Sequence, residues 1–254
     1  MQKATITNIT RFLNETLRVK KIKDASLNGL QVRSRTTGTI HTVGFAVDAC
    51  ISTFEKADRA GVDLLVVHHG IKWRPQKDRD LELTRMAWLK KKNVALYAAH
   101  LPLDLHDEYG NNIQLARMLN VQKPRKFGRY HGIMIGCAGH FSRPTTPLAA
   151  ALVLNKGLGA SSRVYCFGSE RIRTIGIISG GGGSLLHEAC KDGLDCFLVG
   201  EIDLALYNAA REYGMNLIVA GHYATETVGV RSLMPLIRDA FGVKTVFVDD
   251  KKDL

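Results

Sequence analysis

The sequence predicts an α/β fold built from two domains with mixed, largely parallel sheets. Short runs rich in Val, Ile and Leu recur along the chain, and most are followed by a segment with helical periodicity. Hydrophobic residues make up 45% of the 254 residues, which is enough to build a large core. No apolar run approaches the roughly 18 residues that a membrane span requires, and the first residues do not resemble a signal peptide. We therefore expect a soluble, cytoplasmic protein that does not bind membranes.

The individual elements follow from the spacing of apolar residues. A helix is expected over residues 6–19, because Ile6, Ile9, Leu13 and Leu17 form one apolar stripe. Eight short apolar runs predict strands at residues 40–47, 62–68, 94–100, 133–139, 174–179, 196–200, 216–221 and 244–248. Later helices are expected to begin near residues 107 and 184.

A basic segment with Pro and Gly separates two blocks of alternating strands and helices. It covers residues 122–130 and has the composition of a loop. We place a boundary near residue 126, so that 1–126 plus about 217–254 form the first α/β domain and 127–216 the second. A site between the two domains is then expected.

The net charge of +11 is concentrated in the first half of the chain. Residues 1–130 contain 23 Lys and Arg against 12 Asp and Glu, whereas residues 131–254 contain 12 of each. A basic surface confers solubility or attracts an anionic small molecule or nucleotide, and clusters such as Lys90–Lys92 and Lys123–Arg129 also suit phosphate backbones. Charge leaves both interpretations open.

Polar residues gather where three predicted strands end. One strand runs into His68-His69-Gly70, a second into His100 and then Asp104, and a third into His222 and then Glu226. In open parallel sheets the functional crevice lies beyond the carboxyl ends of the strands. We therefore expect these side chains to converge.

The spacing within each piece favours metal binding. A turn at Gly70 lets both His68 and His69 face one crevice, and His222 and Glu226 share a helix face if a helix begins at His222. A histidine at a single strand end is more often hydrogen-bonded structure than ligand, but three imidazoles and two carboxylates together call for cations.

Mixed nitrogen and oxygen ligands predict two divalent ions, of zinc, iron, manganese or cobalt. Such a pair, sharing Glu226 and a bridging hydroxide, would make that hydroxide the nucleophile of a hydrolase. His100 is expected to be a partner of a ligand or a general acid.

Two other features bear on function. Five cysteines include no C-x-x-C pair, so neither a thiolate zinc site nor a redox motif is indicated. Gly180–Gly183 follows a strand and precedes a predicted helix. Its amides suit either a phosphate or, more simply, a tight strand-to-helix turn.

Several long motifs carry a family resemblance over nearly the whole chain. They are Asn28-Gly29-Leu30-Gln31-Val32, His68-His69-Gly70 with Trp73, His100-Leu101-Pro102-Leu103-Asp104 with Gly110-Asn111-Asn112, Gly200-Glu201-Ile202, and Ala220-Gly221-His222-Tyr223-Ala224-Thr225-Glu226. In this order they resemble the Nif-three-like dinuclear metal proteins, also called type 2 homologues of GTP cyclohydrolase I.

The resemblance implies a two-domain Nif-three-like fold, a ring-shaped homo-hexamer and two metal ions per subunit. The matching ligand positions are His68, His69, Asp104, His222 and Glu226. The chain is similar to the short form of the family, without an inserted domain. It has Gly200-Glu201 where many relatives have Gly-Asp, which leaves the role of Glu201 open.

Three functions remain after the resemblance is considered. The first is a metal-dependent hydrolase, similar to GTP cyclohydrolase type 2, with Glu226 and His100 as catalytic residues. The second is a ring-shaped nucleic-acid-binding or regulatory protein with structural metals. The third is a metal-handling protein.

Overall fold

The computed structural model describes residues 3–35, 38–76 and 78–251, which fall into two compact units. The first unit contains the chain up to Leu103 together with Val230–Asp250, and the second contains Asp104–Gly229 and Lys251. The expected partition placed residues 104–126 and 217–229 with the first unit. The backbone pairing described below attaches both segments to the second sheet.

The first unit is built on a five-stranded sheet in the order β1-β4-β3-β2-β11. Its strands are β1 (Gly29–Val32), β2 (Thr42–Asp48), β3 (Leu64–His69), β4 (Ala95–Ala98) and β11 (Lys244–Phe247). Strands β11, β2, β3 and β4 are parallel, and β1 pairs with β4 in the antiparallel sense. The carboxyl ends of β3 and β4 therefore lie side by side.

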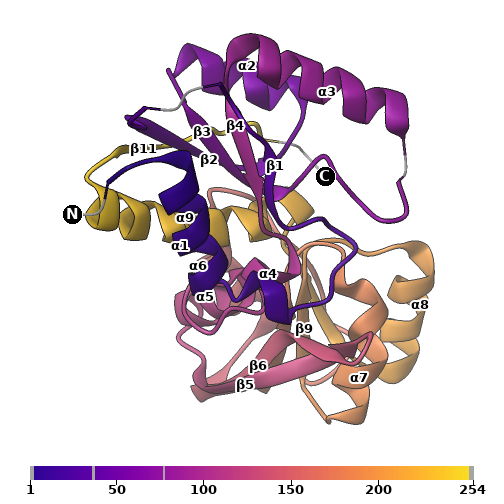
Figure 1. Cartoon of the computed structure of the whole chain (residues 1–254). Coiled ribbons are helices and arrows are strands. Elements are labelled where there is room, and N and C mark those ends of the chain that lie inside the picture. Colours follow the sequence, from indigo (N-terminus) through magenta and orange to yellow (C-terminus); the bar gives the residue numbers. More distant parts are fainter. Residues whose placement is uncertain (1–2, 36–37, 77, 252–254) are drawn as a thin grey trace. The chain divides into compact units, whose positions relative to one another are not determined.

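Helices cover both faces of this sheet (Figure 1). They are α1 (Ile6–Thr16), α2 (Ile51–Arg59), α3 (Arg79–Lys92) and α9 (His222–Phe241), which begins in the second unit. The short η1 (Val19–Lys21) follows α1 and has no buried residue. Buried Phe54 of α2 and Leu89 of α3 pack on Leu65, Val67 and Leu96 of one sheet face. Leu65 and Val67 alternate along β3 with the buried Leu64 and Val66, as expected of a strand covered on both faces.

The second unit is built on a six-stranded sheet in the order β5-β6-β8-β9-β10-β7. Its strands are β5 (Gln122–Tyr130), β6 (Ile133–Thr145), β7 (Arg163–Tyr165), β8 (Ile172–Ile178), β9 (Cys196–Val199) and β10 (Asn216–Val219). Strands β8, β9 and β10 are parallel, and the other pairings are antiparallel. The fold is thus α/β with two mixed sheets, which confirms the predicted class.

The helices of the second unit are α4 (Leu101–Asp104), which ends at the first residue of this unit, α5 (Asn111–Met118), α6 (Pro147–Leu158), η2 (Gly182–Leu185), α7 (Leu186–Lys191) and α8 (Leu204–Tyr213). Leu115 of α5 and Leu154 of α6 pack on Ile175 and Ile177 of β8. Helices α7 and α8 contact β9 and β10. None of the described helices is long and apolar enough to span a membrane.

The structure contains all eight predicted strands and three that the sequence did not suggest, β1, β5 and β7. All three are antiparallel, and β5 is an edge strand with four exposed residues in a row, so it lacks the apolar pattern of a buried strand. The helix expected from residue 107 begins instead at Asn111, and the one expected near residue 184 begins with a 3₁₀ turn at Gly182.

Candidate metal centre

Three histidines gather at the carboxyl ends of β3 and β4 in the first unit. His68 and His69 are the last residues of β3, and His100 follows β4 by two residues. One ring nitrogen of each lies within 4.8 Å of those of the other two. His68 is fully buried, and His69 and His100 expose about a fifth of their side chains. The geometry is that of a group able to hold a metal ion.

Each of these rings is oriented through its Nδ1 atom. Nδ1 of His68 lies 3.0 Å from the carbonyl oxygen of Ala99, and Nδ1 of His69 lies 2.8 Å from Oδ1 of Asp48. Nδ1 of His100 lies 3.0 Å from Oδ1 of Asp24. An imidazole that donates Nδ1–H to a carbonyl or carboxylate presents Nε2 as a metal-binding atom. The three Nε2 atoms are therefore the candidate ligands.

Asp24 is the main support of the His100 segment. Its carboxylate accepts hydrogen bonds from the backbone of Ser26 and Leu101 and from Nδ2 of Asn28, at 2.8–3.1 Å. Burial raises the pKa of Asp24, but the hydrogen bond and charge of His100, with the bonds from Asn28 and Ser26, outweigh it and lower the pKa. Asp24 is therefore an ionised partner that fixes the His100 ring.

The Asn28-Gly29-Leu30-Gln31 motif supports the same strand ends from the side. Oδ1 of Asn28 accepts a hydrogen bond from the backbone of His100 at 2.7 Å, and Oε1 of Gln31 accepts one from Ile71 at 2.7 Å. A Cβ at Gly70 would lie 2.7 Å from the Cβ of Ala98 and would also overlap Gln31. Gly70 is thus required by close packing, whereas the sequence analysis explained it by a backbone turn.

His222 and Glu226 form a second group of candidate ligands, in the second unit. Helix α9 begins at His222, which meets the condition stated for a shared helix face, so Glu226 lies one turn later. Oε1 of Glu226 lies 3.3 Å from Nε2 of His222, and Oε2 of Glu201 lies 3.1 Å from Nδ1. Glu226 is buried, whereas the side chain of Glu201 is half-exposed.

The two carboxylates determine the charge of His222. Burial lowers the pKa of this imidazole, but the hydrogen bonds and negative charges of Glu226 and Glu201 outweigh it and raise the pKa to about 9. Without a metal the ring therefore carries a proton at neutral pH. A divalent cation at Nε2 would replace that proton and neutralise the same carboxylates.

Asp104, the third predicted ligand of the second unit, is a buried and oriented carboxylate. It is the last residue of the short helix α4, which contains Pro102, whereas the sequence analysis expected a turn here. Its Oδ1 accepts hydrogen bonds from Nδ2 of Asn111 at 2.8 Å and from the hydroxyl of Ser179 at 3.1 Å. Two donors on one oxygen fix the direction of the other.

The Gly180–Gly183 loop passes directly over the His222–Glu226 pair. Gly180 has a φ of +61°, and a Cβ there would lie 3.0 Å from Nε2 of His222. Its amide donates to Oγ1 of Thr225, and its carbonyl accepts from the amides of Gly200 and Glu201. The structure therefore contains a tight turn at Gly180, which packs on the candidate ligands His222 and Glu226.

Within the units, the structure brings His68, His69 and His100 together and pairs His222 with Glu226. It places Asp104 beside Asn111 and Ser179. Sequence reasoning left Glu201 without a role, although its position two residues after a strand end was a usable signal. The crevice between the units, which was expected to unite the two groups, stays a prediction.

Comparisons with known proteins agree on one family. The family model described as Duf34/NIF3 (NGG1p interacting factor 3) matches residues 4–253. A protein of Pyrococcus horikoshii named GTP cyclohydrolase 1 type 2 homolog is 42% identical over 248 residues, which cover 97% of this chain and 98% of the relative. A protein of Escherichia coli with the same name is 31% identical over 247 residues, which cover 96% of this chain and 97% of that relative.

Solved structures show the same fold over the full length. The protein ybgI, of unknown function, has a TM-score of 0.89 at 30% identity, with 100% of both chains covered. A protein of Thermus thermophilus has a TM-score of 0.85 at 37% identity, and the match covers 98% of this chain and 99% of that protein.

Proposed function

Because this chain belongs to the Duf34/NIF3 family, we propose that it holds two divalent metal ions and uses them to hydrolyse an anionic small molecule or nucleotide. The proposed ligands are His68 and His69 of the first unit and Asp104, His222 and Glu226 of the second. When bound, such ions supply Lewis acidity and an activated water. The names of the relatives, GTP cyclohydrolase 1 type 2 homologs, are consistent with a hydrolytic reaction of a nucleotide.

The observation that carries the proposal is the cluster of His68, His69 and His100. His68 and His69 supply two preorganised ligand nitrogens, each oriented through Nδ1, and a ring nitrogen of His100 lies within 4.8 Å of both. Together with carboxylate oxygens they match zinc, iron, manganese or cobalt better than calcium or magnesium.

Other residues of the chain would orient the ligands and transfer protons. Glu201 accepts Nδ1–H of His222 and so directs Nε2 of that ring toward Glu226. Asp24 holds the His100 ring in one orientation beside the paired histidines, a position suited to moving a proton to a leaving group. His100 and Glu226 are the proposed catalytic residues.

An anionic substrate is supported by a cavity in the second unit. This cavity has a volume of about 660 Å³, and its lining includes Arg163, Lys251, Ser161 and Glu201. It also includes Gly221 and Tyr223, which flank His222 in the chain. Two cations and a hydroxyl can bind a phosphate or carboxylate next to one of the proposed ligands.

The proposal is tested first by the metal content of chelator-free protein, measured by elemental analysis. We expect about two ions per chain, lost in the double variant His68→Ala/His222→Ala. The variant His41→Ala, which removes an exposed histidine, should keep them. Absence of metal after reconstitution with zinc, iron, manganese and cobalt would refute the dinuclear centre.

Hydrolysis is tested separately, by screening nucleotides, phosphoesters and amides with the metal-loaded protein. Glu226→Ala should abolish turnover without unfolding the chain. Stoichiometric metal without turnover on any of these substrates would instead favour a metal-handling role.

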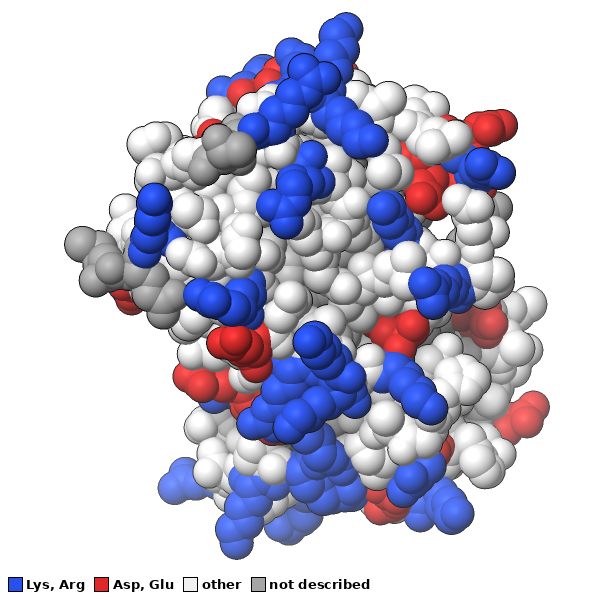
Figure 2. Space-filling model, viewed as in Figure 1, with Lys and Arg blue, Asp and Glu red and all other residues white. Residues whose placement is uncertain are grey.

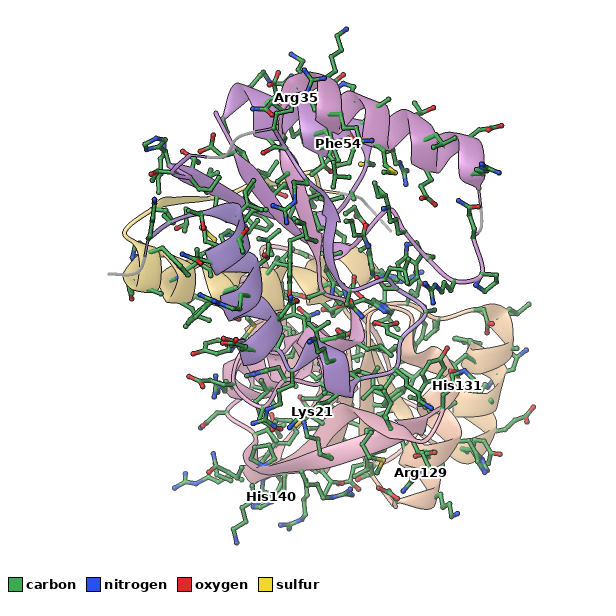
Figure 3. All side chains as sticks on the ribbon, in the orientation of Figure 1. Lys21, Arg35, Phe54, Arg129, His131 and His140 are labelled. Atoms are coloured by element: carbon green, nitrogen blue, oxygen red, sulfur yellow. The ribbon has the colours of Figure 1, made fainter. Side chains whose placement is uncertain are left out.

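A second candidate function, nucleic-acid binding, is supported by the hairpin of β5 and β6. Residues 122–145 contain five Lys and Arg and no Asp or Glu. Lys123, Arg125, Lys126 and Arg129 are exposed, and Figure 2 shows basic side chains gathered where β5 and β6 lie. In Figure 3, Arg129 lies near the turn of the hairpin and His140 near the opposite end. Such a strip can neutralise phosphates.

Binding to a DNA duplex, measured by fluorescence anisotropy at increasing salt, separates this function from the first. Lys123→Glu/Arg129→Glu should weaken binding and reduce its salt dependence. Lys90→Glu/Lys91→Glu on α3, with the same charge change at another exposed basic cluster, serves as the comparison. Binding that is absent, or equally affected by both double variants, would refute the role of the hairpin.

We also propose that the protein is cytoplasmic and assembles as a homo-hexamer. All five cysteines are free thiols, which fits a reducing compartment. Leu148 and Leu152 of α6 are 60% and 68% exposed and share one helix face, a surface that a second copy could cover. Light scattering should give six subunits, and Leu148→Lys/Leu152→Lys should reduce that number.

A further inference from the structure

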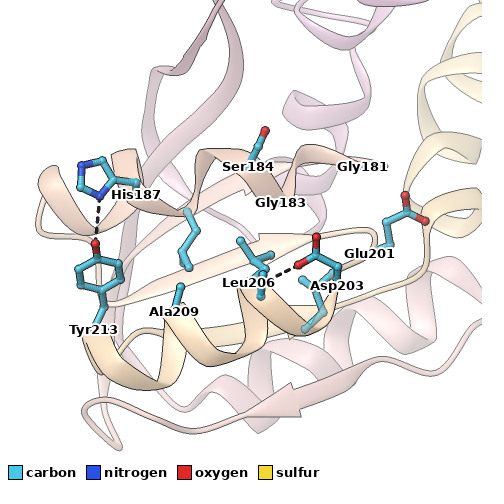
Figure 4. Close-up of a pocket in the computed structure, with 12 residues that line it drawn as sticks. Gly181, Gly183, Ser184, His187, Glu201, Asp203, Leu206, Ala209 and Tyr213 are labelled. Carbon is cyan, nitrogen blue, oxygen red and sulfur yellow. Dashed lines mark hydrogen bonds between the residues drawn. The ribbon is translucent and has the colours of Figure 1, made fainter.

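A cleft in the second unit lies between the segment Gly181–Leu186 and helix α8 (Figure 4). Its volume is about 620 Å³, within the range of sites that hold small organic molecules. Neither the proposed metal ligands nor the basic hairpin belongs to its lining. The cleft shares only Glu201 and Ile202 with the cavity proposed for the anionic substrate, and its other lining residues need their own explanation.

The carboxylates of the cleft give it an acidic character, and its other polar side chains are those of Ser184, His187 and Tyr213. Glu201 and Asp203 contribute carboxylates, and the described residues that line the cleft include neither Lys nor Arg. Oδ1 of Asp203 caps α8 by accepting the amide of Leu206 at 2.8 Å, which leaves Oδ2 to accept a further hydrogen bond. Oε2 of Glu201 faces His222, and Oε1 lies on the side of Gly181.

The rest of the lining is apolar and aromatic. Leu186, Leu206 and Ala209 provide hydrocarbon surface, and Nδ1 of His187 lies 3.4 Å from the hydroxyl of Tyr213 at the end away from Glu201 (Figure 4). The ring of Tyr213 is more than half exposed, so one of its faces can receive a cation.

These surroundings do not suit a phosphate. Gly181 and Gly183 line the cleft together with two carboxylates, and an anion there would be repelled without a compensating cation. The phosphate-binding interpretation of the glycine run is therefore not supported. A Cβ at Gly183 would lie 2.7 Å from Cδ2 of Leu206, so that side chain would have to move.

From this lining we infer that the cleft binds an organic cation, an ammonium or amidinium group carried on an apolar body. The charged N–H donors bind Glu201 and Asp203, and the apolar body lies on Leu206 and Ala209 toward Tyr213. Charge-assisted hydrogen bonds to two carboxylates give the site its preference for a cation. This inference does not depend on metal binding or hydrolysis.

Glu201 links the cleft to the proposed metal ligand His222, because its two oxygens face different partners. A cation at Oε1 therefore shares a carboxylate with Nδ1 of His222. We expect both the cleft and the orientation of His222 to depend on Glu201, whereas Asp203 contributes to the cleft and caps α8.

The test is a titration of the full chain with benzamidine and with benzoate, in which binding is detected by ligand-observed NMR. The two ligands share a benzene ring and differ in charge. Benzamidine should bind and benzoate should not. Asp203→Asn and Glu201→Gln should each weaken benzamidine binding by about tenfold, the loss of one charge-assisted hydrogen bond. Asn remains a good N-cap, so Asp203→Asn keeps α8 capped.

Glu212→Gln is the matched control, since Glu212 is an exposed residue of α8 that does not line the cleft. It should bind benzamidine like the unchanged protein, and circular dichroism should be the same for all variants. Benzoate binding as tight as benzamidine, or benzamidine binding that ignores both carboxylate variants, would overturn the inference. Loss of metal with benzamidine binding intact would refute only the proposed function.

Discussion

Replacing Asp24 with Asn tests whether a buried carboxylate organises the histidine cluster. Its two oxygens accept hydrogen bonds from Asn28 and Leu101 on one side and from Ser26 and His100 on the other. An amide of the same shape has an acceptor on one side only, so its NH₂ group must face two donors. Loss of two hydrogen bonds from a side chain that is 2% exposed should cost about 2–4 kcal/mol.

The loss should depend on pH in a defined direction. The pKa of Asp24 is lowered from its ordinary 3.8 in the folded protein. Its stabilisation is therefore complete above the unfolded value and is lost as the pH falls through the folded value. The difference between the unchanged protein and Asp24→Asn should be full near neutral pH and should shrink below pH 3.8.

Urea unfolding of the metal-free protein, followed by circular dichroism at several pH values, measures this difference. The exposed Asp80 provides the control Asp80→Asn, which should change the free energy of unfolding by less than about 0.5 kcal/mol. If Asp24→Asn were as stable as that control near neutral pH, the carboxylate would not be organising His100 and the reasoning would fail.

Two further substitutions and one labelling experiment test other parts of the structure. Gly70→Ala should destabilise the chain by about 1–3 kcal/mol in urea, because the new Cβ would lie 2.7 Å from the Cβ of Ala98. Asp250→Asn should cost about 1–3 kcal/mol, since this buried carboxylate accepts hydrogen bonds from two hydroxyls and one ammonium group of α2. Burial raises the pKa of Cys137 to about 11, so at pH 8 only about 0.1% is thiolate, and iodoacetamide should label the exposed Cys166 but not Cys137 in the native protein.

Each of these predictions has a control in the same chain. Gly38→Ala adds a methyl group where, among the described residues other than its chain neighbours, no atom lies within 4 Å, and it should be tolerated. Asp249→Asn changes an exposed carboxylate beside Asp250 and should cost much less. Unfolding in urea should make Cys137 as reactive as Cys166. Equal effects of variant and control, or equal labelling in the native state, would contradict the corresponding structural argument.

The missed elements share a physical cause. β5 is basic, contains Pro124 and Gly128, and lies at the edge of its sheet, so its pattern resembled a loop. β1 and β7 are four and three residues long and pair in the antiparallel sense. Short or edge strands bury little apolar surface, and only hydrogen bonding to a neighbour reveals them.

The sequence by itself determined the fold class, the eight strands with apolar runs and the candidate ligands at strand ends. It could do so because buried parallel strands require continuous apolar runs. Polar residues directly after such runs lie at the carboxyl ends of the strands, where sites form in parallel sheets. That α9 begins at His222 was only a condition in the sequence argument, and the structure meets it.

The tertiary structure alone decided which residues support these ligands. Asp24 is far from His100 in the sequence and meets it only through the folding of the first unit. Glu201 meets His222 because β9 and β10 are parallel neighbours whose last residues, Val199 and Val219, are paired in register. Strand order and register arise from packing across the whole sheet, so the apolar pattern of one strand does not identify the strand that pairs with it.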